Sequence, residues 1–340
     1  SFFAPTPANL PGSAPSVDRP FMNPFGYEIS NIAYSIVCKH EGFSSPFGGS
    51  TGPTGWVAPG IVMLYVISFL LFGCFTSGSI LCMFALSILL SLCIIVLIHA
   101  TAQRMLPGSS AGRIAALLYA LCPQELMSLL YPHQTDFNVY TFWFILIAYL
   151  FLRMATSRTT RDACLFALAA GVGTLFLPVM VFPVAVCLGV YAAQNRNRFS
   201  ALIRQVSVCT VIIAVVVAPY IGYQKYRTGR WFFVKSNARF EIALGNNPEF
   251  NGVLVYDLFQ NHHPGSNKEE FAAYRSLGEI PYIQDRFNRF AANFKPKTFL
   301  ILTAKRFLYF FFILKPYIAP ERFQTWRLIA EYIGYAIPGL

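Results

Sequence analysis

The sequence predicts an all-α polytopic integral membrane protein, and three observations lead to this prediction. Of its residues, 55% are hydrophobic and only 12% are charged, and the mean hydropathy is +0.51. A soluble domain of 340 residues does not need so apolar a composition. Several apolar runs approach the roughly 20 residues that a spanning helix needs. Basic residues gather in the short loops between these runs, as they do in cytoplasmic loops.

The net charge and the cysteines indicate which partners, disulfides and metal sites to expect. A net charge of +11 could suggest a nucleic-acid partner, but in a membrane protein the plainer interpretation is loop charge that fixes orientation, so we expect no nucleic acid. The eight cysteines are scattered singly, without a C-x-x-C pair. Neither a disulfide framework nor a zinc site is therefore expected.

The N-terminal part precedes the apolar runs. Residues 1–24 are rich in proline and predict an extended arm. Residues 25–78 predict a first outer loop. Within it, apolar positions recur at helical spacing up to Cys38, which predicts a short amphipathic helix with Glu28 near its start. The glycine- and serine-rich stretch that follows predicts a structured loop at the membrane face.

Residues 79–223 are expected to form a transmembrane helical bundle. Three short loops contain the arginines that indicate the cytoplasmic side: Arg104 and Arg113; Arg153, Arg158 and Arg161; Arg196, Arg198 and Arg204. The run 163–193 then begins and ends on one side, and Pro178 and Pro183 within it predict a hairpin of two short helices. By the same count the run 56–73 begins and ends outside, which predicts an interfacial or re-entrant helix. The other runs are about 79–99, 114–131, 137–152, 201–223 and 298–314.

Residues 224–297 predict a mixed soluble segment on the outer face, and residues 298–340 a C-terminal transmembrane helix with a tail. The soluble segment contains strand-like W-F-F-V at 231–234, a capped helix that starts near Asn267 and a helical pattern over 280–294. Too little of it is apolar for a core of its own. We expect it to pack on the outer ends of the helices, near the Glu28 loop.

Several stretches together resemble a known family. They are G-Y-E-I-S-N-I-A-Y-S-I (26–36), H-E-G-F-S-S-P-F-G-G-S-T-G-P-T-G-W-V-A-P (40–59), Y-P-H-Q-T-D-F (131–137), A-P-Y-I-G-Y-Q-K-Y-R-T-G-R-W-F-F-V (218–234), A-L-G-N-N-P-E-F-N-G (243–252), L-G-E-I-P-Y (277–282) and K-R-F-L-Y-F-F (305–311). In order and spacing, they resemble the bacterial polytopic glycosyltransferases of the GT-C class. This class is related to the protein mannosyltransferases and the aminoarabinose transferase.

The resemblance implies a GT-C-like bundle in the bacterial inner membrane, with large periplasmic loops. It also implies transfer of a sugar from a polyprenyl-phosphate donor to an acceptor at the outer face. The family typically has an aspartate, often in an Asp-Glu pair, where this chain has Gly26, Tyr27 and Glu28. We also expect a first spanning helix and several C-terminal spans of the family to be missing. The alternative is a catalytically inactive structural or accessory subunit of a larger membrane complex.

The resemblance also indicates candidate site residues, each with an alternative. Glu28 is the candidate general base, since the acceptor must lose a proton, but it could be only a favourable charge at a helix start. Asp136 and His133 are weak candidate ligands of a divalent metal ion, Mg or Mn, or else they cap a helix. The leaving phosphate needs positive charge to stabilise it. The candidate cations could instead reach lipid headgroups from the end of a helix. They are Lys225, Arg227, Arg230 and Lys235.

The remaining histidines show no metal-ligand spacing. His40, His262 and His263 have no partner at i+4 and no flanking carboxylate pattern. We therefore expect them to be solvated loop histidines.

Overall fold

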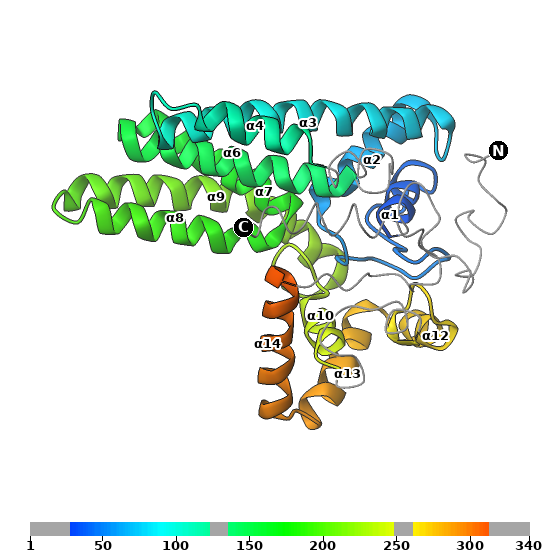
Figure 1. Ribbon diagram of the computed structural model, residues 1–340. Helices are drawn as coiled ribbons and strands as arrows, with labels where there is room; N and C mark the ends of the chain where they lie inside the picture. Colours follow the sequence, from blue (N-terminus) through cyan, green and yellow to red (C-terminus); the bar gives the residue numbers. More distant parts are fainter. Residues whose placement is uncertain (1–27, 123–134, 248–260, 313–340) are drawn as a thin grey trace. The chain divides into compact units, whose positions relative to one another are not determined.

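The computed structural model describes residues 28–122, 135–247 and 261–312 (Figure 1). Within these ranges the regular structure is helical, apart from one isolated antiparallel bridge between Ser44 and Pro53. The chain divides into two compact units. Of the described residues, unit 1 holds 28–57, 122, 236–247 and 261–312, and unit 2 holds 58–121 and 135–235.

Unit 2 is a bundle of apolar helices. Its elements are α2 (Pro59–Phe72), α3 (Ser77–Met105), α4 (Ala111–Ala120), α6 (Thr135–Ser157), α7 (Thr160–Phe176), the 3-10 turn η3 (Pro178–Met180), α8 (Val181–Gln194) and α9 (Phe199–Thr228). In Figure 1 the helices from α3 to α9 run alongside one another. By length and hydropathy, α3, most of α6 and α9 could each cross a membrane. The predicted all-α membrane fold is confirmed.

Two of the bundle's helices show why they begin and end where they do. The Thr76 hydroxyl accepts the N–H of Ser79, and the Ser79 hydroxyl accepts the N–H of Thr76, so α3 starts with a reciprocal capping box. Helix α9 ends at Gly229, which adopts a left-handed conformation with φ of 72° and returns its N–H to the carbonyl of Lys225. Both boundaries follow from local side chains.

Small residues let the central helices of unit 2 approach closely. Ala163, Ala167 and Ala170 of α7 are fully buried. A Cβ on Gly171 would lie 2.9 Å from Cβ of Val216 on α9, closer than side-chain carbons pack. Close helix pairs in membranes use small residues in this way.

The predicted hairpin over 163–193 is confirmed as two helices. Helix α7 ends at Phe176, Pro178 begins the 3-10 turn, and α8 starts at Val181. Pro183 is tolerated because the first turn of a helix has backbone N–H groups without helical acceptors. Helix α2 has 14 residues. At about 21 Å it is shorter than the roughly 30 Å hydrocarbon core, and its interfacial or re-entrant position stays a prediction.

Unit 1 contains shorter helices, namely α1 (Glu28–Val37), α10 (Ala238–Gly245), α12 (Lys268–Leu277), α13 (Glu279–Ala292) and α14 (Pro296–Phe312). The predicted amphipathic helix at Glu28 and the helical pattern over 280–294 are confirmed as α1 and α13. Asn267 caps α12, since its side-chain oxygen accepts the N–H groups of Glu269 and Glu270 at 2.9 Å each.

The predicted strand W-F-F-V at 231–234 is wrong. These residues have no regular structure, and the described chain offers no neighbouring strand to pair with their backbone. Their apolar character has another cause. Val234 is fully buried and packs with Ala58 and Val217 of unit 2.

The glycine-rich loop after α1 is structured, as predicted. The N–H of Ser45 bonds to the carbonyl of Gly52 at 3.1 Å, and the N–H of Thr54 bonds to the carbonyl of Phe43 at 3.0 Å. The side-chain amide of Asn31 on α1 donates to the carbonyl of Pro46 at 3.1 Å. Gly52 has a φ of 83°, a conformation that favours glycine. These bonds fold the loop against α1.

The expectation that the cysteines form no disulfide is wrong. Cys38, just after α1, and Cys74, just before α3, are disulfide-bonded. The six free cysteines are Cys82, Cys93, Cys122, Cys164, Cys187 and Cys209. The sequence neighbours of a lone cysteine do not reveal whether the fold supplies a partner, which is why spacing failed here. Disulfides persist in oxidising compartments.

Candidate active site

Glu28 is the first residue of α1, and its carboxylate lies against two ring nitrogens. Its Oε1 accepts the indole N–H of Trp56 at 3.1 Å and lies 3.2 Å from Nε2 of His263. Its Oε2 has no hydrogen-bond partner among the described residues, and 27% of the side chain is exposed. Glu28 therefore lies at the start of a helix, which was the alternative to a catalytic role. It also forms a polar cluster with Trp56 and His263, the Glu28 cluster.

His263 is buried, so the expectation of a solvated loop histidine is wrong for this residue. Its side chain is 3% exposed. Its Nδ1 accepts the backbone N–H of Gly265 at 3.0 Å. Because a backbone N–H can only donate, Nδ1 is unprotonated and the ring hydrogen sits on Nε2, facing Glu28. No signal in the local sequence indicates this pairing.

Aromatic rings enclose the Glu28 cluster. The ring of Phe47 meets His263 edge-on at 5.3 Å and Trp56 at 5.0 Å between centroids. Phe240 lies 5.8 Å from His263, and Tyr274 lies 4.9 Å from Phe47. Edge-to-face aromatic packing adds specific geometry to the burial of these large side chains. It restrains the rings that donate to Glu28.

Glu279 is a second, fully enclosed carboxylate, at the start of α13. Its Oε1 accepts the N–H of Gly55 at 2.8 Å and the hydroxyl of Ser236 at 2.6 Å. Its Oε2 accepts the hydroxyls of Tyr274, at 2.8 Å, and Thr54. Burial raises the pKa of Glu279, against the opposing effect of these donors. This carboxylate ties the segment next to Trp56 to α12 and α13, a role that sequence reasoning missed.

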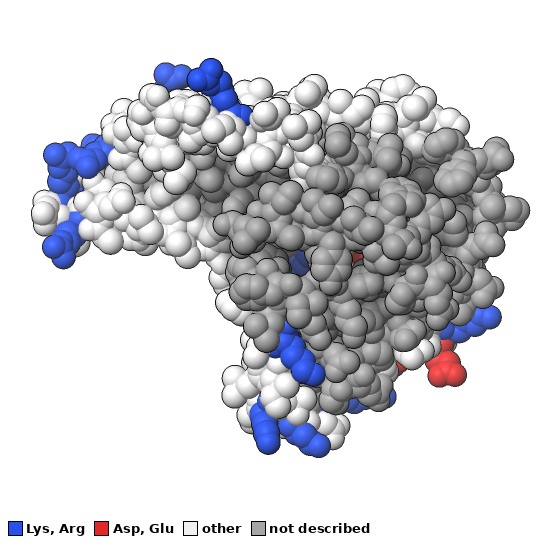
Figure 2. Space-filling model, in the orientation of Figure 1, with Lys and Arg blue, Asp and Glu red and all other residues white. Residues whose placement is uncertain are grey.

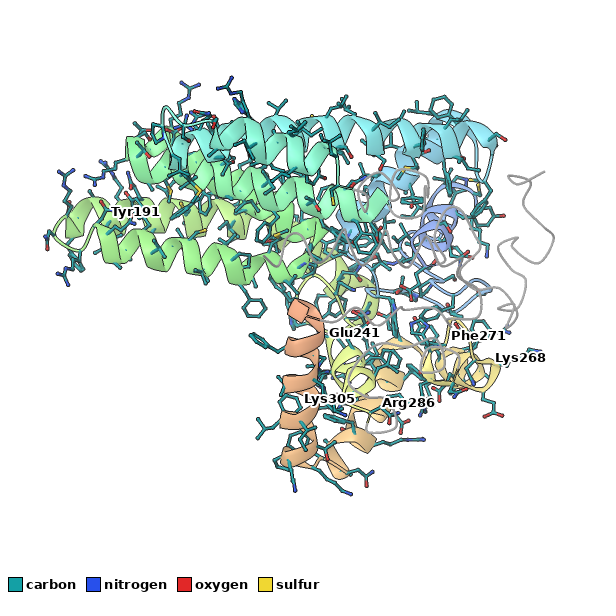
Figure 3. The ribbon with its side chains drawn as sticks, in the orientation of Figure 1. Tyr191, Glu241, Lys268, Phe271, Arg286 and Lys305 are labelled. Atoms are coloured by element: carbon teal, nitrogen blue, oxygen red, sulfur yellow. The ribbon has the colours of Figure 1, made fainter. Side chains whose placement is uncertain are left out.

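A further ion pair joins α12 to α13. Arg286, labelled in Figure 3, donates from Nε to Glu270 at 2.8 Å. The Tyr282 hydroxyl donates to the same carboxylate oxygen at 2.6 Å. Burial and the hydrogen bond to Glu270 raise the pKa of Tyr282. These bonds to Glu270 hold α12 and α13 together.

The four predicted phosphate-binding residues lie at and after the end of α9, in unit 2, whereas Glu28 lies in unit 1. Lys225 donates to the carbonyl of Gly229 at 2.7 Å, and its Nζ is 5.7 Å from the Trp231 ring centre. Arg227 and Lys235 are half-buried, and Arg230 is exposed. The structure thus groups these four cations on one short segment.

The weak metal candidates remain predictions. Asp136 lies in the first turn of α6, in unit 2, where its Oδ1 accepts the N–H of Phe137 at 3.1 Å. His133 lies outside the described residues. In the described ranges, no three His, Cys, Asp or Glu side chains gather as a metal site would need. The contact that Asp136 makes here is local and belongs to the helix start.

Comparison with known proteins gives a family match that lies over the bundle. Residues 57–223 match the family model described as dolichyl-phosphate-mannose-protein mannosyltransferase. This range runs from the start of α2 nearly to the end of α9, and the match confirms the resemblance noted in the sequence. No curated protein and no solved structure matches the chain.

Proposed function

We propose, from the match of residues 57–223 to this GT-C-type glycosyltransferase family model, that the protein transfers a sugar from a polyprenyl-phosphate donor to an acceptor hydroxyl. In this proposal Glu28 is the general base. The observation that carries it is the asymmetry of the Glu28 carboxylate, because Oε1 accepts the Trp56 N–H and lies 3.2 Å from Nε2 of His263, whereas Oε2 has no hydrogen-bond partner among the described residues.

The proposed reaction balances with these groups. The acceptor oxygen forms a bond to C1 of the sugar, and the bond between C1 and the phosphate oxygen breaks. The electron pair of that bond leaves with the polyprenyl phosphate. The acceptor's proton moves to Oε2 of Glu28, which general-base catalysis requires to lie within about 3 Å of the hydroxyl.

The departing phosphate gains negative charge, which cations stabilise. Arg227 and Arg230 can each offer paired N–H donors to phosphate oxygens, and Lys225 offers a point charge. Lys225 and Arg227 lie in the last turn of α9 and Arg230 lies just after it. Because α9 is long and apolar enough to span a membrane, these charges lie near the end of a possible span. A lipid-linked phosphate would occupy that level of the bilayer.

The orientation of α3 supports an outer-face reaction. The disulfide-bonded Cys74 precedes this helix, and Arg104 lies in its last turn. Helix α3 has 29 residues and is about 43 Å long, so these two residues lie at its opposite ends. A disulfide favours an oxidising compartment at one end, and a basic residue favours the cytoplasm at the other. Figure 2 shows Lys and Arg side chains at the end of the bundle where the α3–α4 and α8–α9 loops lie. Glu28 shares its first outer loop with the second disulfide-bonded cysteine, Cys38.

The test is sugar transfer by the purified protein in lipid vesicles, with radiolabelled polyprenyl-phosphate mannose as the first of a panel of polyprenyl-phosphate sugars. Glu28→Gln should lower turnover by roughly 100-fold to 10,000-fold while thermal unfolding stays close to that of the parent. Glu269→Gln is the matched control, because Glu269 is an exposed first-turn acid of α12.

Two results would count against the proposal. Unchanged turnover in Glu28→Gln would remove Glu28 from the mechanism. A parent protein that is inactive with the whole panel would favour the accessory-subunit alternative.

A further inference from the structure

We propose that His263 is the positioning residue of the Glu28 base: its Nε2–H holds Oε1 of Glu28 so that Oε2 is presented to the acceptor. This inference rests on the proposed function and deepens it. His263 does not take the acceptor's proton, so we do not count it as a catalytic residue.

The first step of the argument is the state of the imidazole. The N–H of Gly265 donates to Nδ1 at 3.0 Å, and this backbone group has no second protonation state. The neutral tautomer with hydrogen on Nε2 satisfies both contacts of the ring at once. Gly265 is itself buried, which keeps competing water away from this hydrogen bond.

The second step is the rigidity of the ring. Phe47, Trp56 and Phe240 contact the imidazole at 5.3, 5.7 and 5.8 Å between ring centres. Both Phe47 and Trp56 are almost completely buried. The ring therefore cannot swing away from Glu28 without moving a packed aromatic cluster.

The third step is the effect on Glu28. A glutamate side chain has three rotatable bonds, so a lone carboxylate at a helix start would sample several positions. Here the Trp56 indole N–H donates to Oε1, and Nε2 of His263 lies 3.2 Å from the same oxygen. With both groups at Oε1, Oε2 is left as the oxygen that can accept a proton. The same contacts fix that oxygen in space.

The fourth step concerns the residues that hold Trp56 and His263 in place. The N–H of Trp56 donates to the Thr54 hydroxyl at 3.0 Å, and Thr54 donates to Glu279. Trp56 is thus restrained by the buried carboxylate, whereas His263 is restrained by Gly265 and the rings. Because Trp56 and His263 also contact each other, at 5.7 Å between ring centres, a replacement of His263 must keep a ring of similar size if Trp56 is to stay in place.

The experiment compares three variants in the same vesicle assay. His263→Phe keeps a ring of similar size but removes the donor, and should lower kcat by about 100-fold with an unchanged KM for polyprenyl-phosphate mannose. His263→Gln places an amide N–H at about the reach of Nε2 and should restore kcat to within about threefold of the parent. His262→Phe, at the neighbouring position, is the control and should behave like the parent.

A second measurement does not depend on activity. Nitrogen NMR of isotope-labelled histidine in micelles should show His263 as the neutral tautomer protonated on Nε2, with the signal identified by its absence in His263→Gln. In Glu28→Gln the signal of this nitrogen should shift. A doubly protonated ring, or a signal that Glu28→Gln leaves unchanged, would overturn the inference even if His263→Phe failed to fold.

The outcomes separate this inference from the proposed function. If Glu28→Gln is inactive and His263→Phe turns over like the parent, the positioning role is wrong and the proposed function stands. If Glu28→Gln is fully active, Glu28 is not the general base, and this inference fails together with that assignment, whereas sugar transfer itself still stands. Loss of kcat in His263→Phe with rescue in His263→Gln supports both.

Discussion

The carboxylate of Glu279 accepts the backbone N–H of Gly55 at 2.8 Å, although the two residues are separated by 224 positions in the sequence. Through this bond, α13 holds the segment that leads into Trp56, a donor to Glu28. The hydroxyls of Thr54 and Ser236 bond to the same carboxylate. One buried acid therefore joins three segments around the candidate base, namely the loop after α1, the segment before α10, and α13.

The first prediction concerns the stability that Glu279 provides. Glu279→Ala leaves the buried N–H of Gly55 without an acceptor and removes the partner of three hydroxyls, which should cost roughly 3 kcal/mol or more in the free energy of unfolding. Chemical unfolding in detergent measures this cost. Glu269→Ala, at an exposed site, is the control, and equal stability of the two variants would contradict the prediction.

The second prediction is a pH dependence with a definite sign. Burial raises the pKa of Glu279 above its usual value of 4.5, so the folded chain holds this proton more tightly than the unfolded chain does. The stabilising contribution is complete below pH 4.5 and is lost as the pH rises through the folded pKa. Relative to Glu279→Gln, which does not titrate, the parent should lose free energy of unfolding over that window. If the free energy of unfolding of the parent, relative to Glu279→Gln, stays constant or grows with pH, the raised pKa of Glu279 is wrong.

The third prediction tests the packing of α7 on α9. Gly171→Ala would place a Cβ 2.9 Å from Cβ of Val216, and the helices must separate or Val216 must move. Such overpacking should cost about 1 to 3 kcal/mol. Gly189→Ala on α8 is the matched control, because a Cβ there meets nothing within 4 Å and alanine favours the helix. Thermal unfolding should place Gly171→Ala well below both the control and the parent.

The fourth prediction concerns topology. A cysteine introduced at Ser50, on the exposed part of the outer loop, should react with a membrane-impermeant reagent in intact cells. One introduced at the exposed Ser109, in the α3–α4 loop, should react only after lysis. Labelling of Ser109→Cys in intact cells would place the basic loops outside and reverse the assignment.

The fifth prediction tests the cations after α9. Arg230→Ala removes an exposed guanidinium that we place near the departing phosphate, and should lower kcat/KM for polyprenyl-phosphate mannose by up to about tenfold, and less so at high salt. Arg275→Ala, an exposed arginine on α12, should leave kcat/KM unchanged. An equal effect of the two variants would assign the cations to general surface charge.

The class of this protein and much of its helical structure could be predicted from its amino-acid sequence. The apolar runs predicted the bundle, because each helix satisfies its own backbone and needs only apolar side chains to lie in lipid. Pro178 predicted the break between α7 and α8, and Asn267 predicted the start of α12. These signals are local, since a cap or a proline acts within one turn of the chain. Glu28 was likewise singled out by its place at the head of α1.

Only the tertiary structure decided which residues surround Glu28. His263 looked like a loop histidine, and its burial depends on Phe47, Trp56 and Phe240 from other parts of unit 1. The same holds for Glu279, for the disulfide-bonded cysteines and for W-F-F-V at 231–234, which is apolar because Val234 is buried, without any strand. Burial and pairing of this kind depend on residues far apart in the chain, and no pattern within a short window records them.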